Sequence, residues 1–168
     1  MRSLTRQNAV SGFTLLELMI AITVIAITAT LAVPAMTDLI RNNRVTSQNN
    51  ELVAMLAFAR NEAIRRNDSI TVELVSNVGG WSGEVKDPAG DGADPCTATG
   101  ALRCAEYDRV LLAGDTLTFD FNNRGYVAGF NQIDLALEHT DCSGNRQRRE
   151  ITILPTGQIS STDTACSE

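Results

Sequence analysis

The feature that most constrains this chain is an apolar run of 24 residues, Phe13 to Met36, which contains a single charge, Glu17. As an α-helix the run would be about 36 Å long, enough to cross a hydrocarbon layer of roughly 30 Å. The twelve residues before it are polar and include Arg2 and Arg6. Positive charge on that side places the short N-terminus in the cytoplasm. We therefore expect one membrane span, with the rest of the chain beyond it.

A secretory signal peptide that is removed whole is the alternative interpretation of this segment. The apolar core of such a peptide is usually roughly 7–15 residues long and ends at a small-x-small cleavage site. This run is longer, has no polar break with such a site, and continues through Pro34 into a helical pattern. These features favour a span that is retained.

Glu17 is an unusual residue for a membrane span. Inserting a carboxylate costs roughly 2.5–3.5 kcal/mol, and ionisable residues in spans are generally functional. However, Glu17 lies only four residues from the start of the run, so its side chain could also reach the lipid headgroups. The residues alone leave both interpretations open.

Composition limits the classes of function that this chain can perform. The 168 residues carry a formal net charge of −6, with 14 basic and 20 acidic side chains, one His and four Cys. This excludes a large enzyme, a basic DNA-binding domain and a collagen-like fibre. A small acidic domain remains.

A helical period continues beyond Pro34, and no Gly or Pro follows before Asp68. We predict one helix from about Thr14 to Arg66, bent at Pro34. Its second half is amphipathic and requires a covering layer. The apolar positions recur at three- and four-residue steps: Leu39, Ile40, Leu52, Met55, Leu56, Ala59, Ala63 and Ile64.

After this helix the period changes to two, which predicts β-strands separated by turns. Strands after one long helix indicate an α+β domain, with a mainly antiparallel sheet on the apolar face of the helix. The predicted strands are Ser69–Val75, Leu117–Phe121, Ile133–Leu137 and Glu150–Leu154, with Val110–Leu112 a weaker candidate. Residues 87–100 are predicted to form an exposed loop.

The segment Gly12-Phe13-Thr14-Leu15-Leu16-Glu17, followed by the apolar run, resembles the class III signal of type IV pilins and type II secretion pseudopilins. The resemblance implies that prepilin peptidase cleaves between Gly12 and Phe13 and that Phe13 is then N-methylated. It also implies that Glu17 pairs with the α-amino group of Phe13 on a neighbouring subunit. Loss of Arg2 and Arg6 would change the net charge from −6 to −8.

The resemblance also implies a domain organisation and a location. Residues 1–12 would be the leader and residues 13–36 the transmembrane and assembly helix, with Pro34 near its end. Residues 37–168 would form a pilin-like periplasmic head that includes the amphipathic half of the helix. The protein would sit in the inner membrane until it enters a filament.

Further segments resemble the GspH/FimT branch of this superfamily: Arg41–Val45, Ala57–Arg66, Asn123–Gly125, Arg149–Thr152 and Thr156-Gly157. Members of the branch are minor pilins or minor pseudopilins, low-copy subunits thought to sit at the filament tip and to help start assembly. The resemblance implies a minor pilin with other minor and major pilins as partners. A minor pseudopilin of type II secretion is the alternative.

All four cysteines, Cys96, Cys104, Cys142 and Cys166, lie in the exported part, where an oxidising compartment favours disulfides. No Cys-x-x-Cys is present, so zinc is not expected. Three pairings are open. We prefer Cys96–Cys104, which closes a short loop, and Cys142–Cys166, which ties the C-terminal tail to the sheet. The resemblance also suggests a C-terminal bridge.

Few other residues indicate chemistry. Asp87, Asp91 and Asp94 could bind Ca²⁺ in a Gly-rich loop, but their spacing is not that of an EF-hand. A His139–Cys142 dyad would lose its nucleophile in a disulfide. Nucleophile-elbow, phosphate-loop and dinucleotide motifs are absent. We expect no metal, no cofactor and no catalysis.

DNA binding is a further alternative, because some members of this branch are DNA receptors that use a basic Gly-Arg-x-Arg element. Here the corresponding residues 157–160 read Gly-Gln-Ile-Ser and lack both arginines. A local basic cluster nevertheless remains, formed by Arg146, Arg148 and Arg149, with Arg124 from another turn. The net charge opposes this function, so it is not favoured.

Overall fold

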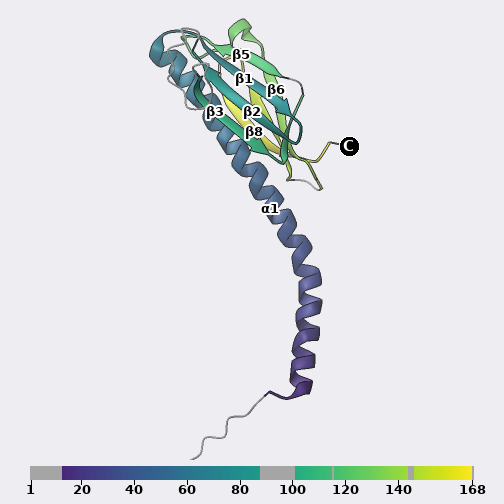
Figure 1. The fold of residues 1–168 in the computed structure, drawn as a ribbon. Helices are drawn as coiled ribbons and strands as arrows, with labels where there is room; N and C mark the ends of the chain where they lie inside the picture. The colour runs from purple at the N-terminus through teal and green to yellow at the C-terminus, as the bar shows by residue number, and fades with distance from the viewer. Residues whose placement is uncertain (1–12, 88–100, 115, 144–145, 168) are drawn as a thin grey trace, which may run out of the picture. The chain divides into compact units, whose positions relative to one another are not determined.

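The computed structural model describes residues 13–87, 101–114, 116–143 and 146–167 (Figure 1). Contacts along the chain divide it into two compact units, one that ends at Thr37 and one that begins at Asp38. Helix α1, Leu15–Arg66, contributes residues to both units. We call the second unit the head.

The first unit consists of the apolar part of α1. Its large apolar side chains, from Leu15 to Met36, are each more than half exposed. The threonine hydroxyls donate hydrogen bonds to carbonyls one turn back, as Thr23 does to Ile20 at 2.8 Å. The polar groups of these side chains are thus satisfied within the helix, as lipid requires. Among the described residues, α1 is the one helix long and apolar enough to cross a membrane.

Pro34 lies inside α1, and helical structure continues on both sides of it. Because proline lacks an N–H, the carbonyl four residues earlier loses its helical partner. One turn later, the Thr37 hydroxyl donates to the Pro34 carbonyl at 2.7 Å. The predicted helix from about Thr14 to Arg66 is confirmed, because α1 begins one residue later, at Leu15, and ends at Arg66.

The predicted apolar stripe is confirmed from Leu52 to Ala63, where the head covers it. The prediction is wrong at Leu39, Ile40 and Ile64, which are about half exposed. Periodicity marks a helix face, but burial also requires an element above that face. Burial along α1 begins at Val45.

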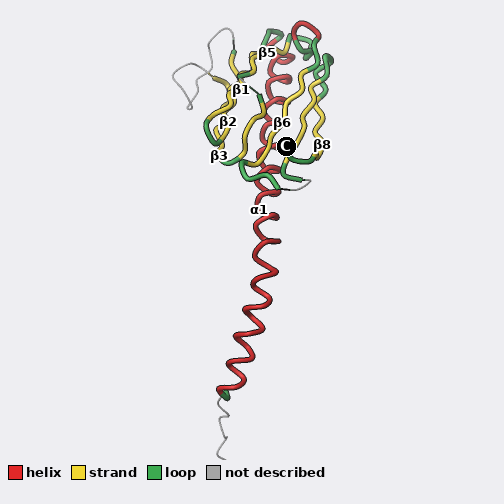
Figure 2. Tube along the Cα trace, turned by 90° about the vertical axis from the view of Figure 1, so that its right-hand side faces the viewer, coloured by secondary structure: helices red, strands yellow, loops and turns green. Residues whose placement is uncertain are grey.

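The head contains two four-stranded antiparallel sheets, in the orders β3-β2-β1-β5 and β4-β6-β7-β8. Figure 2 shows the head portion of α1 with β1, β2 and β3 to one side and β6 and β8 to the other. The α+β class is confirmed, but two sheets replace the one expected. The strands are β1 Ile70–Asn77, β2 Gly80–Lys86, β3 Ala101–Asp108, β4 Val110–Ala113, β5 Leu117–Phe121, β6 Ile133–His139, β7 Arg148–Ile153 and β8 Ile159–Thr164; a short 3₁₀ helix, η1, spans Ala128–Phe130.

The period-two pattern correctly predicted β1, β4, β5, β6 and β7, but it missed β2, β3 and β8. In β2 two of the buried positions are Gly80 and Gly83, so the strand lacks a clear alternation of apolar side chains. Strand β3 has largely half-buried side chains, and the β8 side chains after Ile159 are small and polar. Residues 159–164 are a strand because their backbone pairs with β7.

A buried amide joins the helix to the first sheet. The Trp81 indole donates to Gln48 Oε1 at 2.8 Å, and Gln48 Nε2 donates to the Asp108 carbonyl at 2.9 Å. Both side chains are buried, so each polar group needs its partner. The indole of the single tryptophan thus reports on the packing of α1 against β2.

Arg60 joins the helix to two turns at one end of the head. Its Nε donates to the Gly125 carbonyl at 3.0 Å and its Nη2 to the Thr156 carbonyl at 3.3 Å. Gly125 and Gly157 both have a φ of +75° and lie against the Arg60 side chain. A Cβ at Gly157 would collide with the Gly125 carbonyl oxygen. Three segments that carried the GspH/FimT resemblance therefore meet here, in a structural contact.

This contact predicts that Gly157→Ala destabilises the head more than Gly79→Ala does. Both positions have positive φ, so both variants suffer the backbone cost of about 1 kcal/mol. A Cβ at Gly79 meets no atom within 4 Å, whereas Gly157 adds the collision. We expect an extra loss of about 1–3 kcal/mol in the free energy of unfolding. Denaturation followed by Trp81 fluorescence measures it, and equal losses would contradict the argument.

Candidate functional site

The first candidate site is the start of α1, where Thr14 and Glu17 form a reciprocal cap. The Thr14 N–H donates to Glu17 Oε2 at 3.2 Å, and the Glu17 N–H donates to Thr14 Oγ1 at 3.2 Å. This is a capping box, which satisfies N–H groups that have no partner within the helix. Our sequence analysis missed the role of Thr14, although the Thr-x-x-Glu spacing signals it.

The carboxylate of Glu17 has no cationic partner among the described residues, and it is exposed. The side chain of Phe13 is also 91% exposed. Gly12, the other residue of the predicted cleavage site, lies outside the described residues. The cap therefore uses one carboxylate oxygen of Glu17, Oε2, and leaves its charge uncompensated within the described chain.

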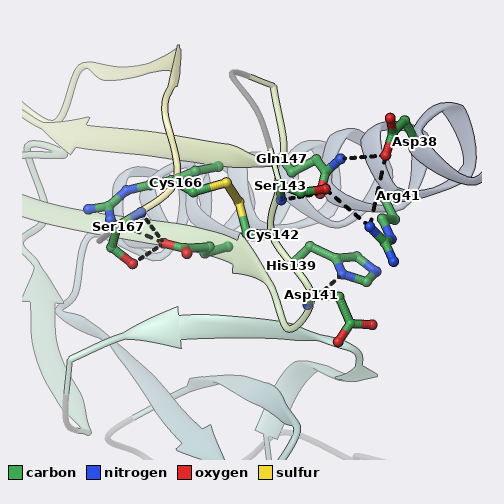
Figure 3. Close-up of a disulfide and its surroundings, with 11 residues drawn as sticks. Asp38, Arg41, His139, Asp141, Cys142, Ser143, Gln147, Cys166 and Ser167 are labelled. Atoms are coloured by element: carbon green, nitrogen blue, oxygen red, sulfur yellow. Dashed lines mark hydrogen bonds and ion pairs between the residues drawn. A yellow bond between two sulfur atoms is a disulfide. The ribbon is translucent and has the colours of Figure 1, made fainter. Parts of the chain in front are cut away.

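A disulfide joins the connection that follows β6 to the residues that follow β8 (Figure 3). It joins Cys142 to Cys166, with a Cα–Cα distance of 5.8 Å, and this is the pairing that we preferred from the sequence. Glu138 Oε2 accepts hydrogen bonds from the Ser167 N–H at 3.3 Å and hydroxyl at 2.7 Å. Covalent and polar contacts thus both hold the residues that follow β8.

The other cysteine pairing is only partly described. Cys104 is disulfide-bonded, but Cys96 lies outside the described residues. Its pairing with Cys104 stays a prediction. Glu138, Cys142 and Cys166 place ligand-type atoms close enough together for a metal ion, but both sulfurs are joined to each other. Their chemistry here is structural.

A His139–Cys142 dyad has no free thiol, because Cys142 is bonded to Cys166. His139 is buried, and its Nδ1 accepts the Asp141 N–H at 3.0 Å. In the same connection between β6 and β7, the Ser143 N–H donates to Gln147 Oε1 at 2.9 Å (Figure 3). Burial lowers the pKa of His139. The charge of Asp141 raises this pKa, whereas three cations lower it further: Arg41, Arg44 and Arg109.

The lowered pKa of His139 predicts that the head loses stability in mild acid. The unfolded chain binds a proton near pH 6.5, whereas the folded chain binds it only at lower pH. The contribution of His139 to the free energy of unfolding should therefore be constant above this range and fall as the pH drops below about 6.5, by at most about 1.4 kcal/mol per pH unit. Urea denaturation of the full chain in detergent, followed by Trp81 fluorescence, measures this. The difference from His139→Gln isolates the single histidine, and parallel curves would contradict the assignment.

The predicted basic cluster is largely neutralised by carboxylates. Arg149 pairs with Asp163, and its side chain is only 12% exposed. Arg148 pairs with Glu138 at 3.1 Å. Burial lowers the pKa of Arg149, with Arg146 as a further cause. Of these three arginines only Arg146 is well exposed, at 75%, and it lies 3.7 Å from Asp163.

Arg124 does not join this cluster. The Gly125 carbonyl beside it accepts a hydrogen bond from Arg60, whereas Gln147 beside Arg146 donates to Asp38 at 3.4 Å. Residues 38 and 60 are separated by roughly 33 Å along the helix axis. The expectation that Arg124 supplements the cluster is therefore wrong. A continuous cationic surface over these four arginines is not formed.

The Gly-rich loop that was considered for calcium, and not favoured, is described only at its first acid. Asp87 is buried and forms an ion pair with the Arg66 guanidinium. Asp91 and Asp94 lie outside the described residues. Asp87 therefore serves the fold, because it compensates a cation at the end of α1.

The head and the uncovered apolar helix together define a pilin-like protein, with a long N-terminal helix and an antiparallel β head. The chain belongs to the family of type II transport protein GspH, whose model matches residues 48–157. A second model, the prokaryotic N-terminal methylation motif, matches residues 7–33. The predicted family is thereby confirmed as that of type IV minor pilins and type II pseudopilins.

Solved structures support the fold. The type IV minor pilin FimU of Pseudomonas aeruginosa strain PAO1 matches in two crystal forms, each 18% identical in sequence. The first covers 70% of this chain and 91% of FimU with a TM-score of 0.53. The second covers 71% and 89% with a TM-score of 0.54. No curated protein sequence matches the chain.

Proposed function

We propose that this chain is a minor pilin of a type IV pilus, which helps to initiate and build the filament near its tip. The observation that carries the proposal is an apolar helix segment whose side chains are uncovered and whose one acid, Glu17, has no cationic partner among the described residues. The methylation motif, residues 7–33, includes most of this segment. Apolar surface of this extent requires lipid or other helices. An assembled filament supplies such helices.

In this proposal prepilin peptidase cleaves between Gly12 and Phe13, and Phe13 is N-methylated. Before assembly the subunit remains in the inner membrane as a single-pass protein, with its head in the periplasm. The carboxylate of Glu17 then pairs with the α-amino group of Phe13 on a neighbouring pilin. A charge in an apolar environment is costly unless paired, so the pairing favours assembly over isolated subunits.

The proposal predicts a mature chain that begins at Phe13. Removal of residues 1–12 eliminates Arg2 and Arg6, so the formal side-chain charge becomes −8. The intact mass should correspond to residues 13–168 with one added methyl group. A mass that lacks all of residues 1–36 would refute the filament function, because the assembly helix would be gone.

Two substitutions of Glu17 separate ion pairing from helix capping. Glutamine can replace glutamate in a capping box but carries no charge. If pairing is the role, Glu17→Gln and Glu17→Val should both enter the membrane and lower recovery in sheared filaments by tenfold or more. If capping is the role, only Glu17→Val should fail. Normal recovery of Glu17→Gln would therefore overturn the pairing.

The type II secretion alternative has the same helix and head, so the two machines must be separated in cells. Deletion of the gene should remove or reduce surface pili and leave secretion of type II substrates unchanged. Complementation with the full chain should restore the pili. The opposite pattern, with lost secretion and normal pili, would identify a minor pseudopilin.

A further inference from the structure

The outer edge of β8 is unprotected in a way that is unusual for a sheet edge. Among the described strands β8 pairs with β7 alone, and Figure 2 shows it at one side of the head. Protein edges are normally blunted by charged side chains, above all lysine, by proline, bulges or very short strands, or by a covering helix or loop. The one charge on β8, Asp163, is paired with Arg149. The six residues of β8, Ile-Ser-Ser-Thr-Asp-Thr, include no lysine or proline, and the β7–β8 register is regular throughout.

The other edges of the described head are each interrupted. The β2–β3 register shifts between Val85 and Lys86, and β4 has only four residues. The last residue of β5, Phe121, also forms a bridge with Val127. Such irregular or short edges receive another strand poorly. Among the edges of the two described sheets, β8 is therefore the most regular.

The turn before β8 sets which backbone groups face outward. Leu154 and Gln158 form a hydrogen-bonded pair, with a Leu154 N to Gln158 O distance of 2.9 Å. Hydrogen-bonded pairs recur at every second residue of an antiparallel ladder. Ser160 and Thr162 therefore bond to β7, whereas Ser161 and its second neighbours, Ile159 and Asp163, direct N–H and C=O groups outward.

A groove of about 330 Å³ lies between β8 and α1. The Ser161 hydroxyl donates to Asn49 Oδ1 at 2.8 Å, which fixes the spacing between strand and helix. At the far end Asp163 is already paired with Arg149. The helix contributes only uncharged residues to the groove: Thr46, Asn49, Asn50 and Val53.

We propose that the β8 edge receives an extended segment of a neighbouring filament subunit, which adds a further strand to the sheet β4-β6-β7-β8. Only an extended backbone presents donors and acceptors at the two-residue repeat of the outward groups. The uncharged helix wall selects small, uncharged side chains on the inner face of that segment. The choice of partner rests on the proposed pilin function.

The first arm of the test measures whether the edge accepts a strand, independently of any filament. The probe is a Thr-Val-Thr-Val-Thr segment, joined to the C-terminus of the full chain by a Gly/Ser linker, which gives a local concentration of about millimolar. Amide exchange of Ile159, Ser161 and Asp163 should slow by tenfold or more. The control probe has proline in place of its central valine. Equal exchange with both probes would overturn the proposal.

The second arm tests the partner in cells with Ser161→Pro. Proline removes an outward N–H and leaves the bonds to β7, so it is tolerated at an edge. Ser161→Ala is the matched control, because it also loses the bond to Asn49 but keeps the N–H. Both variants should have equal Tm, whereas Thr162→Pro should lower Tm by breaking a β7 bond. We expect recovery in sheared filaments to fall tenfold or more for Ser161→Pro only.

The two arms separate this proposal from the pilin function. If Glu17→Val fails to enter filaments but Ser161→Pro enters normally, the filament function stands and the proposed strand partner is wrong. If the wild-type chain is absent from filaments that do form, the pilin function fails and the assigned partner fails with it. The exchange arm still decides whether β8 accepts a strand.

Discussion

The head depends on burial of one stripe of α1 against the strands around it. Leu52, Met55 and Leu56 lie on this stripe and are fully buried. Each contributes roughly 1.5–3 kcal/mol by removal from water, more than surface contacts provide. Gln48 orients the helix on the sheet, because its amide must form hydrogen bonds with both the Trp81 indole and the Asp108 carbonyl. Apolar packing thus holds the helix, and this amide fixes its rotation.

The part of α1 that belongs to the first unit of the chain meets a different requirement. There the apolar side chains are uncovered all round, and the carboxylate of Glu17 accepts the Thr14 N–H and has no cationic partner among the described residues. A continuous helix can serve both requirements because its backbone bonds are internal in either solvent. The environment of the side chains, and not the helix itself, distinguishes the two halves.

Charge in the head is used mainly within the head. Arg149 and Arg148 pair with Asp163 and Glu138, and Arg66 pairs with Asp87. This is consistent with assembly through helix packing and strand addition, and it weighs against binding of nucleic acid phosphates.

The sequence by itself determined the apolar helix, its isolated Glu17, the α+β class and the strands whose apolar residues alternate, because each is a local period that burial imposes on one element. It did not reveal β8, whose side chains after Ile159 are small and polar, or the meeting of Arg60 with the turns at Gly125 and Gly157. Nor did it reveal that Arg124 lies apart from the other arginines. Only the tertiary structure decided these, because backbone pairing and contacts between distant segments leave no period in the chain.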